Sequence, residues 1–369
     1  MNERPMTIDR FTLRPGMNRG DSVLLLDEAR HGAAFDSFPG RYGVIAALAS
    51  AETPAALDAL QALENSRRFV DSGKASFFAA IPGLRPAAEL ARRFPSIRFL
   101  EGAGDWASAF GAGLEGCWVI VNPMLRVVDI AALRNRERAF GLLERLPPPG
   151  ELPGPSPPAP ILLLPGVFEP DLCRHLIDVF ERDGGRETGF MQDSDGKAVE
   201  RFDRDWKRRR DIMLSDPALV AAIRARIGRR VCPEIKKAFQ FMVSRTERDL
   251  VSRYDADAGG HFAPHRDDTG LSVAHRRFAM SIPLNDDFEG GEMRFPEYSP
   301  HRYKGAPGTA IVFSSSILHG VSTVAKGSRY VFLTFLFDEA AEKVRLANLN
   351  ALRAAQPGQT VAATARWGH

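Results

Sequence analysis

Cysteine is scarce in this chain, and a long apolar run is missing. The 369 residues include three cysteines, Cys117, Cys173 and Cys232, which are far apart and form no Cys-x-x-Cys pair. This usage argues against a disulfide framework and a zinc knuckle, and it suits a reducing compartment. Residues 161–164 are too few to cross a bilayer, and the N-terminus lacks the apolar core of a signal peptide. We therefore expect a cytoplasmic protein with no membrane partner.

An excess of charge of one sign is also absent. The chain has 49 basic and 46 acidic residues, a net charge of +3, which gives no electrostatic reason to expect a nucleic-acid partner. The densest basic run, Lys207 to Arg210, is typical of a solvated surface with local ion pairs. A basic contact for an acidic substrate is the alternative interpretation.

Proline is concentrated in one segment, residues 147–160, which reads PPPGELPGPSPPAP. Such a segment cannot form a helix or a central strand, and it favours an extended, semi-rigid spacer. We therefore predict a first domain at 1–146, a linker at 147–160, a second domain at 161–340 and a helical tail at 341–369.

The first domain alternates strand-like and helix-like segments, which predicts an α/β layer fold. Thr53 as N-cap and Pro54 at the first helical position predict the start of a helix that runs through Phe69. The other predicted elements are strands at 41–49 and 74–80, a helix at 85–94, and a hairpin of 117–121 with 126–130.

This domain resembles the peroxiredoxin branch of the thioredoxin-like fold. The resemblance rests on Gly20-Asp21, on the strand that leads into Thr53-Pro54 and its helix, and on the late hairpin at 118–130. A thiol peroxidase needs a thiolate at the start of that helix, where no cysteine occurs. Cys117 is interpreted as a small buried hydrophobe. We predict a non-catalytic domain that could dock a protein partner.

The second domain begins with helical patterns and then changes to short strands. Helices are predicted from about Glu169, over 216–231 and over 233–241. After Leu250 the strands are short and broken by Gly and Pro, which predicts a β-barrel or jelly-roll core.

Within these strands, His265 and Asp267 are separated by one residue, so on a strand both side chains would point to the same face. His319 follows an apolar strand further along, and Arg329 opens another. Two histidines and one carboxylate can bind one face of Fe(II) and leave the opposite positions open. Tyr254 lies upstream on a predicted strand.

The segments SIPLNDDFEGGEMRFP (281–296) and GAPGTAIVFS (305–314) complete this pattern. With the His-x-Asp…His…Arg set they make residues 161–340 resemble the prolyl 4-hydroxylase-type family of 2-oxoglutarate/Fe(II) oxygenases. The resemblance implies a double-stranded β-helix core, bound Fe(II), and 2-oxoglutarate and O2 as co-substrates. Hydroxylation of a C–H bond would give succinate and CO2 as co-products, and ascorbate is a candidate reductant.

The resemblance also implies a role for each residue. His265, Asp267 and His319 would be the catalytic metal ligands. Arg329 would pair with the distal carboxylate of 2-oxoglutarate, for which a bidentate guanidinium is suited. Tyr254 would donate its hydroxyl to the co-substrate.

Several neighbours are predicted to stay outside the metal site. His261 is expected at most to contact a metal ligand without binding the metal itself. Asp268 is expected to point to the opposite face of the strand, and His275 to be either hydrogen-bonded or exposed to solvent. Asn285 could line the site or cap a turn. Residues 184–210 are either a lid or a plain surface loop.

The sequence indicates less about the identity of the substrate than about the metal and the co-substrate. A peptidyl, prolyl-type substrate is the first choice, and a small metabolite is the nearest alternative. A non-catalytic binding module is the rival from another class, and a zinc hydrolase with the same ligands is a further one.

Overall fold

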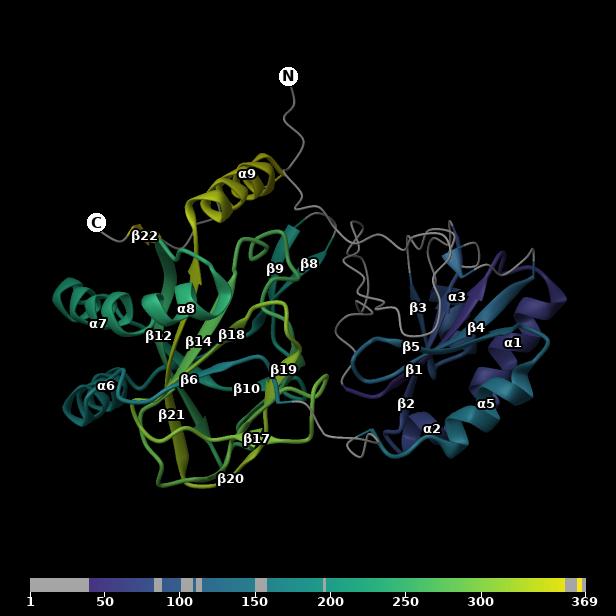
Figure 1. Cartoon of the computed structure of the whole chain (residues 1–369), viewed down its shortest axis with the longest axis horizontal. Coiled ribbons are helices and arrows are strands. Elements are labelled where there is room, and N and C mark those ends of the chain that lie inside the picture. Colours follow the sequence, from purple (N-terminus) through teal and green to yellow (C-terminus); the bar gives the residue numbers. More distant parts are fainter. Residues whose placement is uncertain are drawn as a thin grey trace. The chain divides into compact units, whose positions relative to one another are not determined.

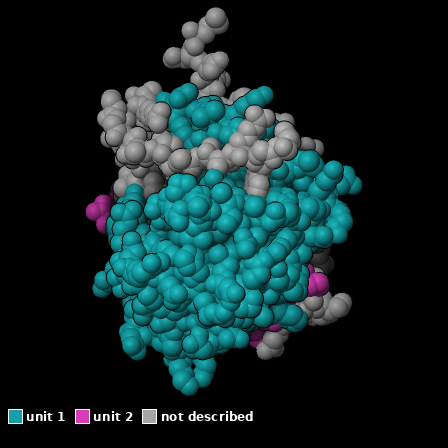
Figure 2. Space-filling model, turned by 90° about the vertical axis from the view of Figure 1, so that its left-hand side faces the viewer, with its two compact units in different colours: residues 1–7, 159–294, 301–369 teal, residues 8–158, 295–300 magenta. Residues whose placement is uncertain are grey.

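The computed structural model describes residues 40–82, 88–100, 109–110, 115–149, 158–194, 197–355 and 364–366. Contacts divide these residues into two compact units, an N-terminal unit of 40–158 with 295–300 and a C-terminal unit of 159–294 with 301–366 (Figure 2). Gly20-Asp21 and most of the predicted proline linker lie outside the described residues.

The N-terminal unit is built on a mixed five-stranded sheet with the order β3-β2-β1-β4-β5 (Figure 1). The first three strands are parallel, β4 runs antiparallel to β1, and β5 runs antiparallel to β4. The predicted strands and hairpin are confirmed. The strands are β1 (Tyr42–Leu48), β2 (Ala75–Ala80), β3 (Ile97–Leu100), β4 (Gly116–Val121) and β5 (Val127–Ala132).

The first helix of this unit begins where its capping residues predict. The Thr53 hydroxyl accepts a hydrogen bond from the Ala56 amide at 3.2 Å, and Pro54 occupies the first turn. The predicted continuation through Phe69 is wrong, because the helix ends at Asn65 and a turn separates it from a second short helix. The helices are α1 (Pro54–Asn65), α2 (Arg68–Asp71), α3 (Ala88–Arg93) and α5 (Arg136–Arg145).

The C-terminal unit contains two larger antiparallel sheets, in agreement with the predicted jelly-roll core. The larger has the order β6-β18-β14-β21-β12-β11-β7, with β22 also paired to β12. The smaller has the order β10-β13-β19-β16-β17, and the pairs β8-β9 and β15-β20 stand apart.

The strands of the C-terminal unit have the following bounds: β6 Leu162–Leu164, β7 Arg186–Glu187, β8 Phe190–Ser194, β9 Lys197–Arg201, β10 Lys207–Arg208, β11 Arg210–Met213, β12 Arg245–Asp255, β13 His261–His265, β14 Phe278–Pro283, β15 Glu289–Gly290, β16 Met293–Arg294, β17 Arg302–Tyr303, β18 Ala310–Ser314, β19 His319–Val321, β20 Val324–Lys326, β21 Ser328–Phe337 and β22 Thr364–Arg366.

Three helices cover one face of the larger sheet: α6 (Pro170–Asp183), α7 (Pro217–Arg230) and α8 (Cys232–Phe239) (Figure 1). Leu176 and Ile223 of these helices pack with Val251 and Phe332 of the sheet, and all four are fully buried. This packing occupies alternate residues of β12 and β21, so the intervening residues point to the other face of the sheet.

The predicted tail contains α9 (Glu339–Ala355), and β22 adds a strand that a purely helical tail would not contain. None of the helices in the described part of the chain is long and apolar enough to span a bilayer.

Candidate metal centre

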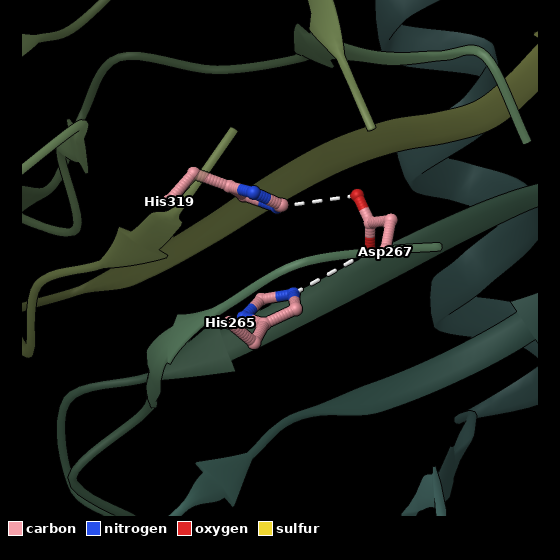
Figure 3. A group of neighbouring side chains, drawn as sticks. All are labelled: His265, Asp267 and His319. Carbon is pink, nitrogen blue, oxygen red and sulfur yellow. Dashed lines mark ion pairs between the residues drawn. The ribbon is translucent and has the colours of Figure 1, made fainter. Parts of the chain in front are cut away.

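Two histidines meet where strands β13 and β19 pair. His265 ends β13, His319 begins β19, and the two are register partners. Asp267 follows β13, and its amide donates to the Ser315 carbonyl at 2.9 Å, which fixes the backbone after the strand. The predicted ligands are therefore brought together, as Figure 3 shows, and one candidate ligand atom from each of the three residues lies within 4.8 Å of the other two.

Both imidazoles present the same nitrogen to the carboxylate. His265 Nδ1 lies 2.8 Å from the Ala263 carbonyl, and His319 Nδ1 lies 2.9 Å from the Ile317 carbonyl. A carbonyl oxygen can only accept, so each Nδ1 carries a proton, and Nε2 is the nitrogen left to face a metal. The Nε2 atoms of His265 and His319 lie 3.5 and 3.3 Å from the Asp267 carboxylate. This is the orientation that a metal ligand needs.

The electrostatics of the three groups suit a divalent cation. Burial, helped by the neighbouring His319, lowers the pKa of His265 and favours its neutral form. Burial alone would raise the pKa of Asp267, but the two imidazoles outweigh it and hold this pKa well below its usual range. Neutral imidazoles and an ionised carboxylate are the ligand forms that bind a metal. The residues present therefore fit Fe(II).

Aromatic side chains hold both imidazoles in place. The Phe262 ring stacks on His265 with centroids 3.6 Å apart, and the Phe313 ring lies 4.5 Å from His319. Packing of this kind removes alternative ring orientations, so the ligand geometry is set before a metal binds.

The predicted co-substrate residues lie side by side on the larger sheet. Tyr254 of β12 and Arg329 of β21 are register partners, and they are only 1% and 3% exposed. The Arg329 guanidinium carbon lies 5.1 Å from the centre of the Tyr254 ring. Burial lowers the pKa of Arg329, against the opposing effect of Tyr254. Among the described residues no carboxylate pairs with Arg329, which leaves this buried cation available for one from outside.

The interpretation of Lys207 to Arg210 as a solvated surface is wrong for half of the run. Lys207 is 6% exposed, and the side chain of Arg209 is 8% exposed. The run passes from β10 in the smaller sheet to β11 in the larger one, so alternate residues point inward. All four residues of the run are basic, so the sequence holds no signal that separates Arg209 from its neighbours.

Arg209 contacts the co-substrate residues directly. Its Nη1 donates to the Tyr254 hydroxyl at 3.3 Å, and its Nη2 donates to Asp211 at 2.8 Å. Lys207 lies beside it and donates to the Thr188 hydroxyl at 2.8 Å. Burial, together with the Arg209 guanidinium, lowers the pKa of Lys207 to about 6.

Two neighbours stay outside the metal site, as expected. His261 contacts the carbonyls of Gly259 and Asp205 at 2.8 and 3.1 Å, so both ring nitrogens are engaged away from the ligands. Asp268 accepts a hydrogen bond from the Ser316 hydroxyl.

Two other residues have clearer roles than the sequence suggested. His275 is 1% exposed, and its Nε2 lies 3.0 Å from the Glu247 carboxylate. The Asn285 side chain donates to the Ser328 carbonyl at 2.7 Å and accepts from the Tyr330 amide at 2.8 Å. These bonds tie Asn285 to the start of β21, which favours the turn-capping alternative.

Comparison with known proteins agrees with the chemistry of this site. No protein-family model matches the chain. Part of the chain is similar to PKHD-type hydroxylases. The match to the protein of Sphingopyxis alaskensis is 29% identical over 126 residues, covering 31% of this chain and 57% of that protein. The match to the protein of Acaryochloris marina is 35% identical over 85 residues, covering 22% of this chain and 38% of that protein.

The chain thus spans about half the length of the curated relatives it matches. Similar solved structures include a viral collagen prolyl hydroxylase from Paramecium bursaria Chlorella virus-1, with a TM-score of 0.37 and 16% identity over 48% of this chain and 94% of that one. A Pseudomonas putida prolyl-4-hydroxylase has a TM-score of 0.36 and 14% identity over 49% and 94%. Structural similarities at this level do not establish a function for this chain. The predicted resemblance to prolyl 4-hydroxylase-type oxygenases is confirmed by the curated relatives.

Proposed function

We propose that this protein is an Fe(II)- and 2-oxoglutarate-dependent dioxygenase that hydroxylates a C–H bond. One observation carries the proposal: two imidazole Nε2 atoms converge on the Asp267 carboxylate in the same unit that buries Arg329, which has no carboxylate partner among the described residues. A bound iron would supply the oxidising chemistry, in which one oxygen atom of O2 enters the hydroxylated product and the other enters the succinate formed with CO2 from 2-oxoglutarate.

The protein's own residues bind and orient. The backbone carbonyls at the two Nδ1 atoms hold His265 and His319 with their Nε2 atoms toward Asp267. Arg329 offers a bidentate fork to the distal carboxylate of the co-substrate. The Tyr254 hydroxyl accepts from Arg209, so its own proton remains available to the same carboxylate.

We propose a peptidyl, prolyl-type substrate, with a small metabolite as the alternative. The similarity to PKHD-type hydroxylases supports a hydroxylase. Residues 184–210 support a substrate-contacting role, because they include the paired strands β8 and β9 and are not a plain loop. Phe190 and Trp206 of this segment pack against the cluster that contains Tyr254 and Phe262.

For the N-terminal unit we propose a redoxin-like domain without peroxidase activity that docks a protein partner. A parallel βαβ unit followed by a hairpin and a helix on one sheet supports this fold. Burial raises the pKa of the Cys117 thiol to about 12, which leaves it protonated and unreactive.

The test of the oxygenase is succinate formation from 2-oxoglutarate with Fe(II) and O2. We expect the Asp267→Ala variant to fall to background, because it loses the only anionic ligand of the triad. Asp257→Ala is the matched control, since Asp257 is an exposed residue of the loop before β13. Full succinate formation by Asp267→Ala would remove the metal-ligand assignment.

A further inference from the structure

Strand β12 contains one residue too many for its partner. Glu247 pairs with Phe335 and Leu250 pairs with Leu333, so Arg248 and Asp249 together oppose a single residue of β21. Arg248 has a φ of +58°, a left-handed conformation that glycine adopts readily and arginine adopts at a cost. Bulges that keep such a residue are often found where a side chain must be re-aimed at a functional site.

The two bulge residues point in different directions. Asp249 faces the helices, where its carboxylate accepts from Arg224 of α7 at 2.6 Å and from the Thr334 hydroxyl at 3.0 Å. Arg248 has other neighbours. Burial lowers its pKa, the guanidiniums of Arg276 and Arg209 lower it further, and nearby carboxylates oppose them. The Arg276 guanidinium lies 3.7 Å from the centre of the Phe335 ring, on the face of β21 opposite Phe332, so these neighbours place Arg248 near the interior face of the sheet.

That interior face is connected to the candidate metal centre. Arg276 Nη1 donates to the carbonyl of Asp267 at 3.4 Å, and its Nε donates to Glu247 at 2.6 Å. On the other side, Arg209 donates to the hydroxyl of Tyr254. The charged neighbours of Arg248 therefore contact both a predicted metal ligand and a predicted co-substrate residue.

The cations of this interior differ in whether they have a carboxylate. Arg276 is paired with Glu247 and Arg209 with Asp211. Arg248 forms no ion pair or hydrogen bond with any other described residue, and Arg329 has no carboxylate partner among them. The distal carboxylate of 2-oxoglutarate would neutralise one of these two guanidiniums. The second remains as a buried or half-buried positive charge without a partner, which is unfavourable unless a ligand supplies one.

We infer that Arg248 binds a carboxylate of the primary substrate, so the enzyme selects an acidic molecule for hydroxylation. This inference rests on the proposed oxygenase function, because it assigns Arg329 to the co-substrate. The carboxylate could belong to an acidic side chain of a peptide or to a free acid. In either case a guanidinium would form a charge-assisted pair with it.

The test measures binding of matched acid and amide probes to the protein saturated with Mn(II) and 2-oxoglutarate, which prevents turnover and fills the Arg329 position. One arm uses a blocked peptide with glutamate on both sides of a proline, and its glutamine counterpart. The other uses butyrate and butyramide. We expect the acid to bind about tenfold more tightly than its amide in at least one arm, and the arm with the tighter acid identifies the source of the carboxylate.

The variants separate this inference from a general effect on the site. Arg248→Gln should abolish the preference for the acid, while the Kd for 2-oxoglutarate changes less than about threefold. Arg245→Gln, on the same strand and paired with Glu339, is the control that should keep the preference. No acid preference in either arm, or one that survives Arg248→Gln, would overturn the inference. A protein that fails to bind 2-oxoglutarate at all would instead overturn the proposed function.

Discussion

The two units bury very different chemistry. Strands β1, β2 and β4 of the N-terminal unit are buried along their whole length, and they fill its interior with aliphatic and aromatic side chains. The C-terminal unit instead buries a set of charged and titratable side chains: Lys207, Arg209, Asp211, Glu247, His275, Arg276, His319 and Arg329. Burying charge is costly, and groups of this kind concentrate where function requires them. The contrast supports the proposal that the chemistry resides in the second unit.

The largest expected effect comes from removing a histidine of the triad. His319→Ala should weaken Fe(II) binding more than about a hundredfold, since a lost ligand costs more than a lost supporting contact. Anaerobic equilibrium dialysis measures it, with His261→Ala as the control because His261 contacts backbone carbonyls. Equal iron affinity in the two variants would show that His319 is not a metal ligand, and the C-terminal unit would lose its assigned metal site.

The next effect concerns the co-substrate. Arg329→Gln should raise the Kd for 2-oxoglutarate roughly a hundredfold, because a buried carboxylate would lose its charged partner. Arg253→Gln is the matched control, since Arg253 lies on the neighbouring strand and pairs with Asp255 at 2.5 Å. If the Kd for 2-oxoglutarate changed little in Arg329→Gln and strongly in Arg253→Gln, the carboxylate of the co-substrate would bind at Arg253 instead of Arg329.

Buried Lys207 predicts a dependence of stability on pH. Its pKa is lowered to about 6 in the folded protein from 10.5, so between these values the unfolded chain binds a proton that the folded chain lacks. The free energy of unfolding should therefore rise as the pH increases from 7 to 9. Urea midpoints at the two pH values measure this rise, and Lys207→Met should reduce it. An identical pH dependence in wild type and variant would show that Lys207 is not buried in its neutral form.

The smallest expected effect is in the N-terminal unit. Cys117→Ala should leave succinate formation unchanged and lower the free energy of unfolding by roughly 1 kcal/mol, through lost packing. Peroxide followed by a sulfenic-acid probe should leave Cys117 unlabelled, because its thiol stays protonated. Labelling of Cys117 linked to a change in activity would instead indicate a redox role for this unit.

Local signals in the sequence were sufficient for many elements. Thr53-Pro54 predicted the start of α1, and Asp216 before Pro217 predicted α7, because a cap acts on amides within one turn. The triad was also predictable from its residue types and their order, although Asp267 lies just after β13 and not on the strand that its spacing predicted.

The rest depends on contacts between distant segments. Arg209 points inward because its run crosses between two sheets, which composition cannot show. Arg248 is re-aimed by a bulge that is defined only by the register of β12 against β21. The pairing of His275 with Glu247 joins two segments whose proximity no local pattern encodes.

The most direct test of the central claim is an anaerobic titration of the metal-free protein with Fe(II) and then 2-oxoglutarate, followed by visible absorbance. The triad and Arg329 predict a weak charge-transfer band that requires both additions and is lost in Asp267→Ala. A folded protein that binds iron but shows no band with 2-oxoglutarate would contradict the claim, and the binding-module interpretation would then take its place.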